Sequence, residues 1–177
     1  ALVAGNTGLL KHASNVPQCA QAIETVFEEA GFPRGVFRTL MIPSSQVAAV
    51  IEDVRVHAVT LTGSEPAGRQ VAATAGSQVK KSVLELGGSD PFIVLEDADL
   101  ELAVEQALVS SFLNTAQSCI AAKRFILVEA VADEFVSRFL TAVETLRMGD
   151  KLDENNKLGQ MARIDLSDEL HQQVGDS

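Results

Sequence analysis

Residues 57–88 have the sequence HAVTLTGSEPAGRQVAATAGSQVKKSVLELGG, in which a helical pattern lies between two apolar runs. The first run (57–61) and the second run (82–86) have the length and composition of β-strands. The segment between them, 66–75, has helical periodicity and ends at Gly76. Strands that are joined through a helix are typical of parallel pairing, because parallel strands need a long crossover connection. This stretch therefore predicts an α/β fold.

The same alternation extends to both sides of this stretch. It predicts further strands at 7–11, 36–42, 92–95 and 124–129, and further helices at 16–30, 44–54, 100–111 and 131–146. In the first of these helices, Asn15 is the expected N-cap and Gly31 the expected stop. Strands that are apolar along most of their length favour a doubly wound, mostly parallel sheet with helices on both faces.

Composition excludes several classes of protein. The chain of 177 residues has 14 Lys and Arg against 24 Asp and Glu, which gives a formal net charge of −10. An acidic chain repels phosphate backbones and anionic lipid, so neither nucleic acid nor a membrane is an expected partner. No apolar run approaches the roughly 18 residues that a transmembrane helix needs. The two cysteines, Cys19 and Cys119, are far apart and fit a reducing compartment, so we expect a cytoplasmic protein.

The strand and helix pattern restarts after Gly88, which predicts two domains, at 1–88 and 89–177. The chain starts at Ala1, within an apolar stretch, and stops at Ser177, just after a helical pattern. Both ends have the character of cuts, and we expect the chain to be part of a longer protein.

Cys119 is the first candidate for catalytic chemistry. A thiol becomes a nucleophile when a helix N-terminus, a cation or a base favours its thiolate. Cys119 lies between a predicted helix and a predicted strand, and Lys123 and Arg124 are cations close to it in sequence. A buried structural cysteine would fit the same position.

Glu85 is the second candidate, near the end of the apolar strand at 82–86. A carboxylate among apolar neighbours tends to have a raised pKa, which suits a general base. A glutamate that points into solvent from a strand end fits the position equally well. Gly87 and Gly88 follow, and two glycines let a backbone pass close to a ligand or adopt a positive φ.

Two further segments have features of phosphate-binding sites. Gly63 and Ser64 precede a predicted helix, whose N-terminal amide groups and dipole attract anions. Lys11 ends a predicted strand, where its ammonium group could meet a phosphate or a ribose hydroxyl, or only solvent. The three histidines are isolated and there is no G-x-S-x-G segment, so metal-ligand spacing and the common serine hydrolase motif are both lacking.

Taken together, four segments resemble motifs of the aldehyde dehydrogenase superfamily. They are 10–13 (LKHA), 61–64 (LTGS), 85–91 (ELGGSDP) and 117–119 (QSC), in the family's order. Within the superfamily, Lys11-His12-Ala13, Glu85 to Leu95 and Met161-Ala162-Arg163 are most similar to bacterial succinate-semialdehyde dehydrogenases.

The resemblance implies a Rossmann-like coenzyme domain at 1–88, the start of a catalytic domain at 89–177, and an oxidation of aldehydes that uses NADP or NAD. It implies that Cys119 attacks the aldehyde to form a thiohemiacetal and then a thioester, which water activated by Glu85 hydrolyses. The implied coenzyme ligands are Lys11 at the adenosine ribose, Ser64 with Gly63 at the pyrophosphate, and Leu86 and Gly87 at the nicotinamide. A homo-oligomer is implied for the full-length protein.

Two positions depart from the family pattern. Ser14 stands where relatives that prefer NAD often have glutamate, and a serine beside Lys11 can admit a 2′-phosphate, so we expect NADP to be accepted. Ala116 replaces a usual glycine, and it would strain the loop if that position has a positive φ. Since parts of both family domains are missing, an esterase that uses Cys119, or an inactive nucleotide-binding fragment, remains an alternative.

Overall fold

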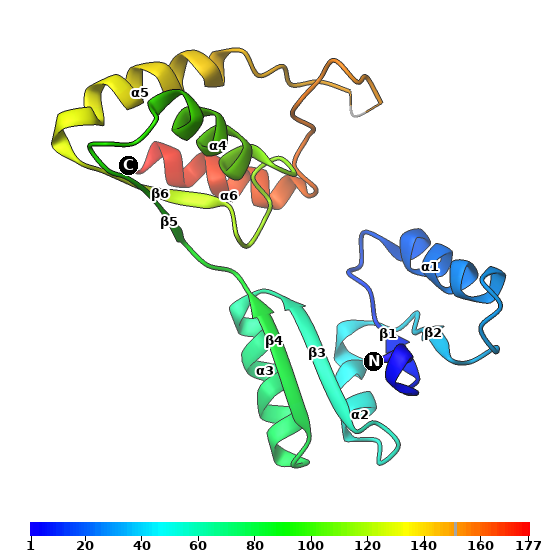
Figure 1. Ribbon diagram of the computed structural model, residues 1–177. Helices are drawn as coiled ribbons and strands as arrows, with labels where there is room; N and C mark the ends of the chain where they lie inside the picture. The colour runs from blue at the N-terminus through cyan, green and yellow to red at the C-terminus, as the bar shows by residue number, and fades with distance from the viewer. Residues whose placement is uncertain (151) are drawn as a thin grey trace. The chain divides into compact units, whose positions relative to one another are not determined.

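Strands and helices alternate along the chain in the computed structural model, which describes residues 1–150 and 152–177 (Figure 1). The chain divides into two units, Ala1–Glu85 and Leu86–Ser177, so that the division falls between Glu85 and Leu86. The sequence pattern places it slightly later, after Gly88. Within the described residues no helix is long and apolar enough to cross a membrane.

The first unit contains two strand–helix–strand segments. Its elements are η1 (Leu2–Ala4), β1 (Gly8–Leu10), α1 (Pro17–Glu29), β2 (Phe37–Thr39), η2 (Ser44–Gln46), α2 (Val47–Glu52), β3 (Ala58–Gly63), α3 (Glu65–Ser77) and β4 (Lys81–Leu86). β1 pairs with β2 in parallel, with α1 as the connection, and β3 pairs with β4 across α3. Both 3₁₀ turns and α2 are short, and α2 packs on α3.

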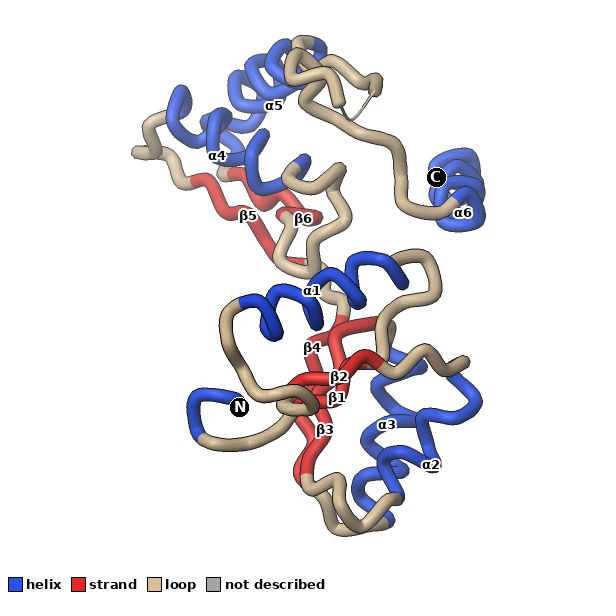
Figure 2. Tube along the Cα trace, turned by 90° about the vertical axis from the view of Figure 1, so that its right-hand side faces the viewer, coloured by secondary structure: helices blue, strands red, loops and turns tan. Residues whose placement is uncertain are grey.

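The second unit contains one strand–helix–strand segment, which two helices follow. Its elements are β5 (Asp90–Val94), α4 (Leu100–Phe112), β6 (Ala122–Leu127), α5 (Glu129–Glu144) and α6 (Ile164–Gly175). β5 and β6 are parallel, and Figure 2, which colours strands red, shows them side by side. The predicted α/β fold with parallel strand pairs is confirmed. Among the described residues the strands form three separate two-stranded sheets.

The second unit has a phenylalanine-rich core on one face of its strand pair. Val94, Val104, Ala107 and Phe135 are buried, and the side chains of α4 and α5 pack there against β5 and β6. Five rings adjoin one another with centroids 5.2 to 6.5 Å apart, namely Phe92, Phe112, Phe125, Phe135 and Phe139. This core fixes β5 and β6, and therefore the segments that enter them.

Several element boundaries differ from the sequence expectation. Asn15 is not the N-cap of α1: the helix begins at Pro17 and Val16 is the N-cap, without a side-chain cap. A residue before proline is kept out of helical geometry, which makes Val16 the boundary. The strand expected at 36–42 shortens to β2, since only three residues of β1 pair with it. Gly31 does follow the end of α1 with φ +85°, as expected of a stop.

The C-terminal end of α3 contains a valine in a glycine conformation. Val79 has φ +55°, its N–H donates to the Gly76 carbonyl, and the next N–H, of Lys80, donates to the Ala75 carbonyl. These two bonds form a Schellman motif, which places the residue after the helix cap in the left-handed region. A β-branched residue is strained there, and Val79 is exposed, so its side chain gains little from packing.

Replacing Val79 by glycine is therefore expected to stabilise the chain by about 1 kcal/mol, because relief of the left-handed strain outweighs the extra freedom of the unfolded chain. Urea unfolding followed by circular dichroism measures the change. Val54, an exposed valine outside the left-handed region, supplies the control. Val54→Gly should destabilise, and a Val79→Gly protein that loses stability as Val54→Gly does would contradict the prediction.

Candidate active site

Cys119 is exposed in the loop that connects α4 with β6. This loop leaves α4 at Leu113, and its next three residues, Asn114, Thr115 and Ala116, have φ of 54°, 57° and 59°. Ala116 therefore has the positive φ at which an alanine in place of glycine strains the loop. Residues other than glycine and asparagine cost roughly 1–2 kcal/mol each in this region, so Thr115 and Ala116 hold the loop that carries Cys119 in an unfavourable conformation.

The two cations near Cys119 bind main-chain carbonyls. Lys123 Nζ donates to the Cys119 carbonyl at 2.9 Å and to the Ser118 carbonyl at 3.3 Å. Arg124 Nε donates to the Ser89 carbonyl at 2.9 Å. Lys123 therefore fixes the peptide of the cysteine, and Arg124 ties the end of the loop to the segment that precedes β5.

The glycine pair after Glu85 approaches the cysteine loop. A Cβ placed on Gly88 would lie 3.3 Å from Asp90 Oδ1 and 3.8 Å from the Cys119 carbonyl oxygen. Neither Gly87 nor Gly88 has a positive φ. The lack of a side chain at Gly88 instead lets its main chain lie close to the Cys119 peptide. In the β5–β6 pair Asp90 faces Ala122, which explains why two sequence-distant motifs meet at the start of both strands.

Glu85 lies on β4 and is exposed in its unit, whereas its neighbours Leu84 and Leu86 are half-buried. Within this unit the Glu85 carboxylate is therefore not buried among apolar side chains. The pairing of β4 with β3 fixes its main chain, and it is the last residue of the first unit.

Lys11 directly follows β1, and its Nζ lies 3.4 Å from Ser44 Oγ at the start of η2. Ser14 is exposed three positions further on. The sequence analysis missed Ser44, although it follows β2, and the carboxyl ends of parallel strands meet at one edge. An exposed ammonium group beside a hydroxyl suits a phosphate or a ribose.

Gly63 ends β3, and Ser64 is the N-cap of α3. The Ser64 hydroxyl makes no capping hydrogen bond, which leaves the first amide groups of a 13-residue helix without a side-chain cap. Glu65 in the first turn is paired with Arg69, so its charge is offset. The free amide groups and the dipole of this helix end suit an anion such as a phosphate group.

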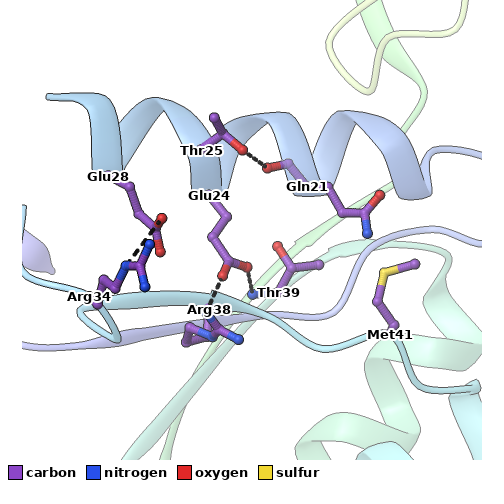
Figure 3. Close-up of a pocket in the computed structure, with 8 residues that line it drawn as sticks. All are labelled: Gln21, Glu24, Thr25, Glu28, Arg34, Arg38, Thr39 and Met41. Carbon is purple, nitrogen blue, oxygen red and sulfur yellow. Dashed lines mark hydrogen bonds and ion pairs between the residues drawn. The ribbon is translucent and has the colours of Figure 1, made fainter.

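A polar pocket of about 490 Å³ lies between α1 and β2 and is separate from these residues (Figure 3). Its charged side chains pair with each other: Arg38 contacts Glu24 at 2.6 Å and Arg34 contacts Glu28 at 3.8 Å. No residue that the sequence singled out lines it. The described residues contain no group of three His, Cys, Asp or Glu side chains that could hold a metal ion.

Comparison with known proteins gives one consistent result. The model of the aldehyde dehydrogenase family matches residues 1–177. A succinate semialdehyde dehydrogenase [NAD(P)+] of Escherichia coli K12 is 56% identical over 173 residues, which are 98% of this chain and 37% of that protein. A probable succinate-semialdehyde dehydrogenase [NADP(+)] of Synechocystis is 53% identical over 98% of this chain and 38% of its own length.

A solved structure gives the same result for the fold. The succinic semialdehyde dehydrogenase of Streptococcus pyogenes, in complex with NADP+, superposes with a TM-score of 0.94 at 37% identity, over 97% of this chain and 38% of that one. The chain thus spans between 37% and 39% of the length of the relatives that it matches.

Proposed function

The chain belongs to the aldehyde dehydrogenase family, and on that premise we propose that its whole protein oxidises succinic semialdehyde to the acid with NADP or NAD. The observation that carries the proposal is the position of Cys119, exposed in a strained loop whose peptide adjoins Gly88 of the Glu85 motif. The substrate is proposed because the E. coli, Synechocystis and S. pyogenes relatives are named for it.

In the proposed reaction the Cys119 thiolate attacks the carbonyl carbon of the aldehyde, and a thiohemiacetal forms. The Cys119 N–H, for which no hydrogen bond is present within the described residues, is free to donate to the oxyanion. NADP or NAD, held by the residues assigned below, would supply the acceptor for the hydride that the thiohemiacetal carbon releases. Glu85 then takes a proton from water, which attacks the resulting thioester and releases the acid and the Cys119 thiol.

We assign the coenzyme to the first unit and the residues next to its end. Lys11, Ser14 and Ser44 would hold the adenosine ribose and its 2′-phosphate, and Gly63 and Ser64 the pyrophosphate. Leu86 and Gly87 would line the nicotinamide site. Homo-oligomeric assembly and a cytoplasmic location of the whole protein belong to the same proposal.

Ser14→Glu is expected to weaken NADP binding by about 10- to 100-fold, because a carboxylate repels the 2′-phosphate across a partly solvated site. NAD binding should be unchanged or tighter. Ser14→Gln, which has the same size without the charge, is the control. Titration with NADPH and with NADH, followed by the fluorescence of the reduced nicotinamide, gives the dissociation constants. Equal NADPH affinity in Ser14→Glu and Ser14→Gln would remove Ser14 from the site.

The function is tested in a full-length hybrid, in which this chain replaces the matched 37% of the E. coli relative. Production of reduced coenzyme from succinic semialdehyde, with NADP and with NAD, supports the proposal. A hybrid that unfolds as cooperatively as its parent but reduces neither coenzyme overturns it, and hydrolysis of an activated ester by such a hybrid would identify an esterase. A second hybrid with only residues 86–177 exchanged keeps the test decisive for Cys119 if the first does not fold.

A further inference from the structure

The loop that carries Cys119 needs more than local bonds to keep its shape. Three consecutive left-handed residues, Asn114 to Ala116, together raise the free energy of the loop by several kcal/mol. Such a conformation persists when its surroundings over-determine it. Local ties come from Asn114 Nδ2, which donates to the Gln117 carbonyl at 3.3 Å, and from Lys123.

A distant segment of the second unit adds two contacts. Gln117 Oε1 accepts a hydrogen bond from the Ala162 N–H at 3.1 Å, across 45 positions of sequence. Nearby, a Cβ on Gly159 would lie 3.6 Å from Thr115 Oγ1, so the main chain at Gly159 adjoins the strained residues themselves. Segment 159–162 therefore lies against the nucleophile loop, and the Gln117 side chain is its hydrogen-bonded link.

The N-terminal end of this segment is tied to an earlier part of the chain. Leu158 bridges to Met148, and the Leu158 N–H donates to the Arg147 carbonyl at 3.0 Å. After the segment, α6 begins at Ile164, and the Arg163 guanidinium binds Asp165 two positions away, which lowers the pKa of that carboxyl. Because the segment is held at Leu158, it can resist movement of the loop that it contacts.

We propose that Gln117 is a positioning residue that ties the nucleophile loop to segment 159–162 and so fixes the location of Cys119. The expected effect on catalysis rests on the proposed function. The tie between Gln117 and segment 159–162 does not depend on that function. Gln117 is two positions from Cys119, so release of its side chain lets the thiol and the Cys119 N–H shift together. A displacement of about 1 Å at a reacting group can lower the rate by roughly 100-fold.

The test compares Gln117→Met, which removes the acceptor at similar volume, with Gln117→Glu, which keeps an oxygen that can accept from Ala162 N–H. In the hybrid enzyme, Gln117→Met should lower kcat by about 10- to 100-fold with the KM for coenzyme unchanged. Gln117→Glu should recover most of this loss. Gln160→Met changes an exposed glutamine of the same stretch that forms no hydrogen bond within the described residues, so it is the matched control and should leave kcat unaltered.

Hydrogen exchange supplies a readout that does not depend on activity. Peptides that cover residues 114–121 should exchange faster in Gln117→Met than in the unaltered hybrid or in Gln160→Met. Unchanged exchange there overturns the proposal, as does a Gln117→Glu enzyme as impaired as Gln117→Met. If the unaltered hybrid reduces no coenzyme while Gln117→Met still loosens the loop, the proposed function fails and the tie between Gln117 and Ala162 stands.

Discussion

Cys119→Ala is expected to abolish aldehyde oxidation in the hybrid enzyme, with kcat/KM at least about 1,000-fold lower. Without the thiol no thiohemiacetal forms, and the carbon that must release hydride is never made tetrahedral on the protein. The side chain is exposed, so coenzyme affinity and stability should both be retained. Formation of reduced coenzyme, measured by absorbance, gives the rate.

The other cysteine provides the control for this experiment. Cys19 is also exposed, but it lies on α1, and no residue of α1 has a proposed role in the reaction. Cys19→Ala should keep the full rate. A Cys119→Ala enzyme that still oxidises the aldehyde at a substantial rate would assign the nucleophile to another residue.

Glu85→Gln is expected to separate the two halves of the reaction. Removal of a general base lowers its step by about 100- to 10,000-fold, and here that step is hydrolysis of the thioester. Rapid mixing should therefore show a burst of reduced coenzyme of one equivalent per site, followed by a much slower steady rate. Mass spectrometry should find the acyl group on the Cys119 peptide.

Glu96→Gln is the matched control, because Glu96 is likewise an exposed glutamate near the end of a strand, two positions after β5. It should leave both phases unchanged. If Glu85→Gln removed the burst along with the steady rate, Glu85 would act before acylation and its assignment as the base for hydrolysis would be wrong.

Local sequence pattern was sufficient to predict the order and type of the elements, and it failed where pairing sets the boundaries. β6 starts at Ala122 and not at Arg124, because Ala122 faces Asp90, the first residue of β5. The partner strand is distant in sequence, and hydrophobic periodicity contains no information about its register. The α1 boundary at Val16 shows the opposite case, because its cause is local. Pro17 keeps Val16 out of helical geometry, and this effect is stronger than the capping preference of Asn15.

Some residues of the candidate site could likewise be predicted from the sequence, and others could not. Cys119, Glu85 and Ser64 stand out in the sequence because of their residue type and their place at element ends, and the family resemblance supplied their roles. Ser44 is 33 positions from Lys11, and Ala162 is 45 positions from Gln117, with no motif to relate either pair. A contact made by a main-chain N–H, as at Ala162, leaves no trace in residue type. Such partners become visible only when the fold brings them together.

The phenylalanine cluster of the second unit makes the chain suitable for optical study. The chain contains neither tryptophan nor tyrosine, so its near-ultraviolet circular dichroism comes from phenylalanine alone, apart from the two cysteines. Five of the eight rings pack against one another between the strand pair and its two helices. Near-ultraviolet bands report fixed side-chain packing, whereas far-ultraviolet bands report secondary structure. Loss of the first with retention of the second would therefore mark loosening of the packing around the phenylalanines before the helices melt.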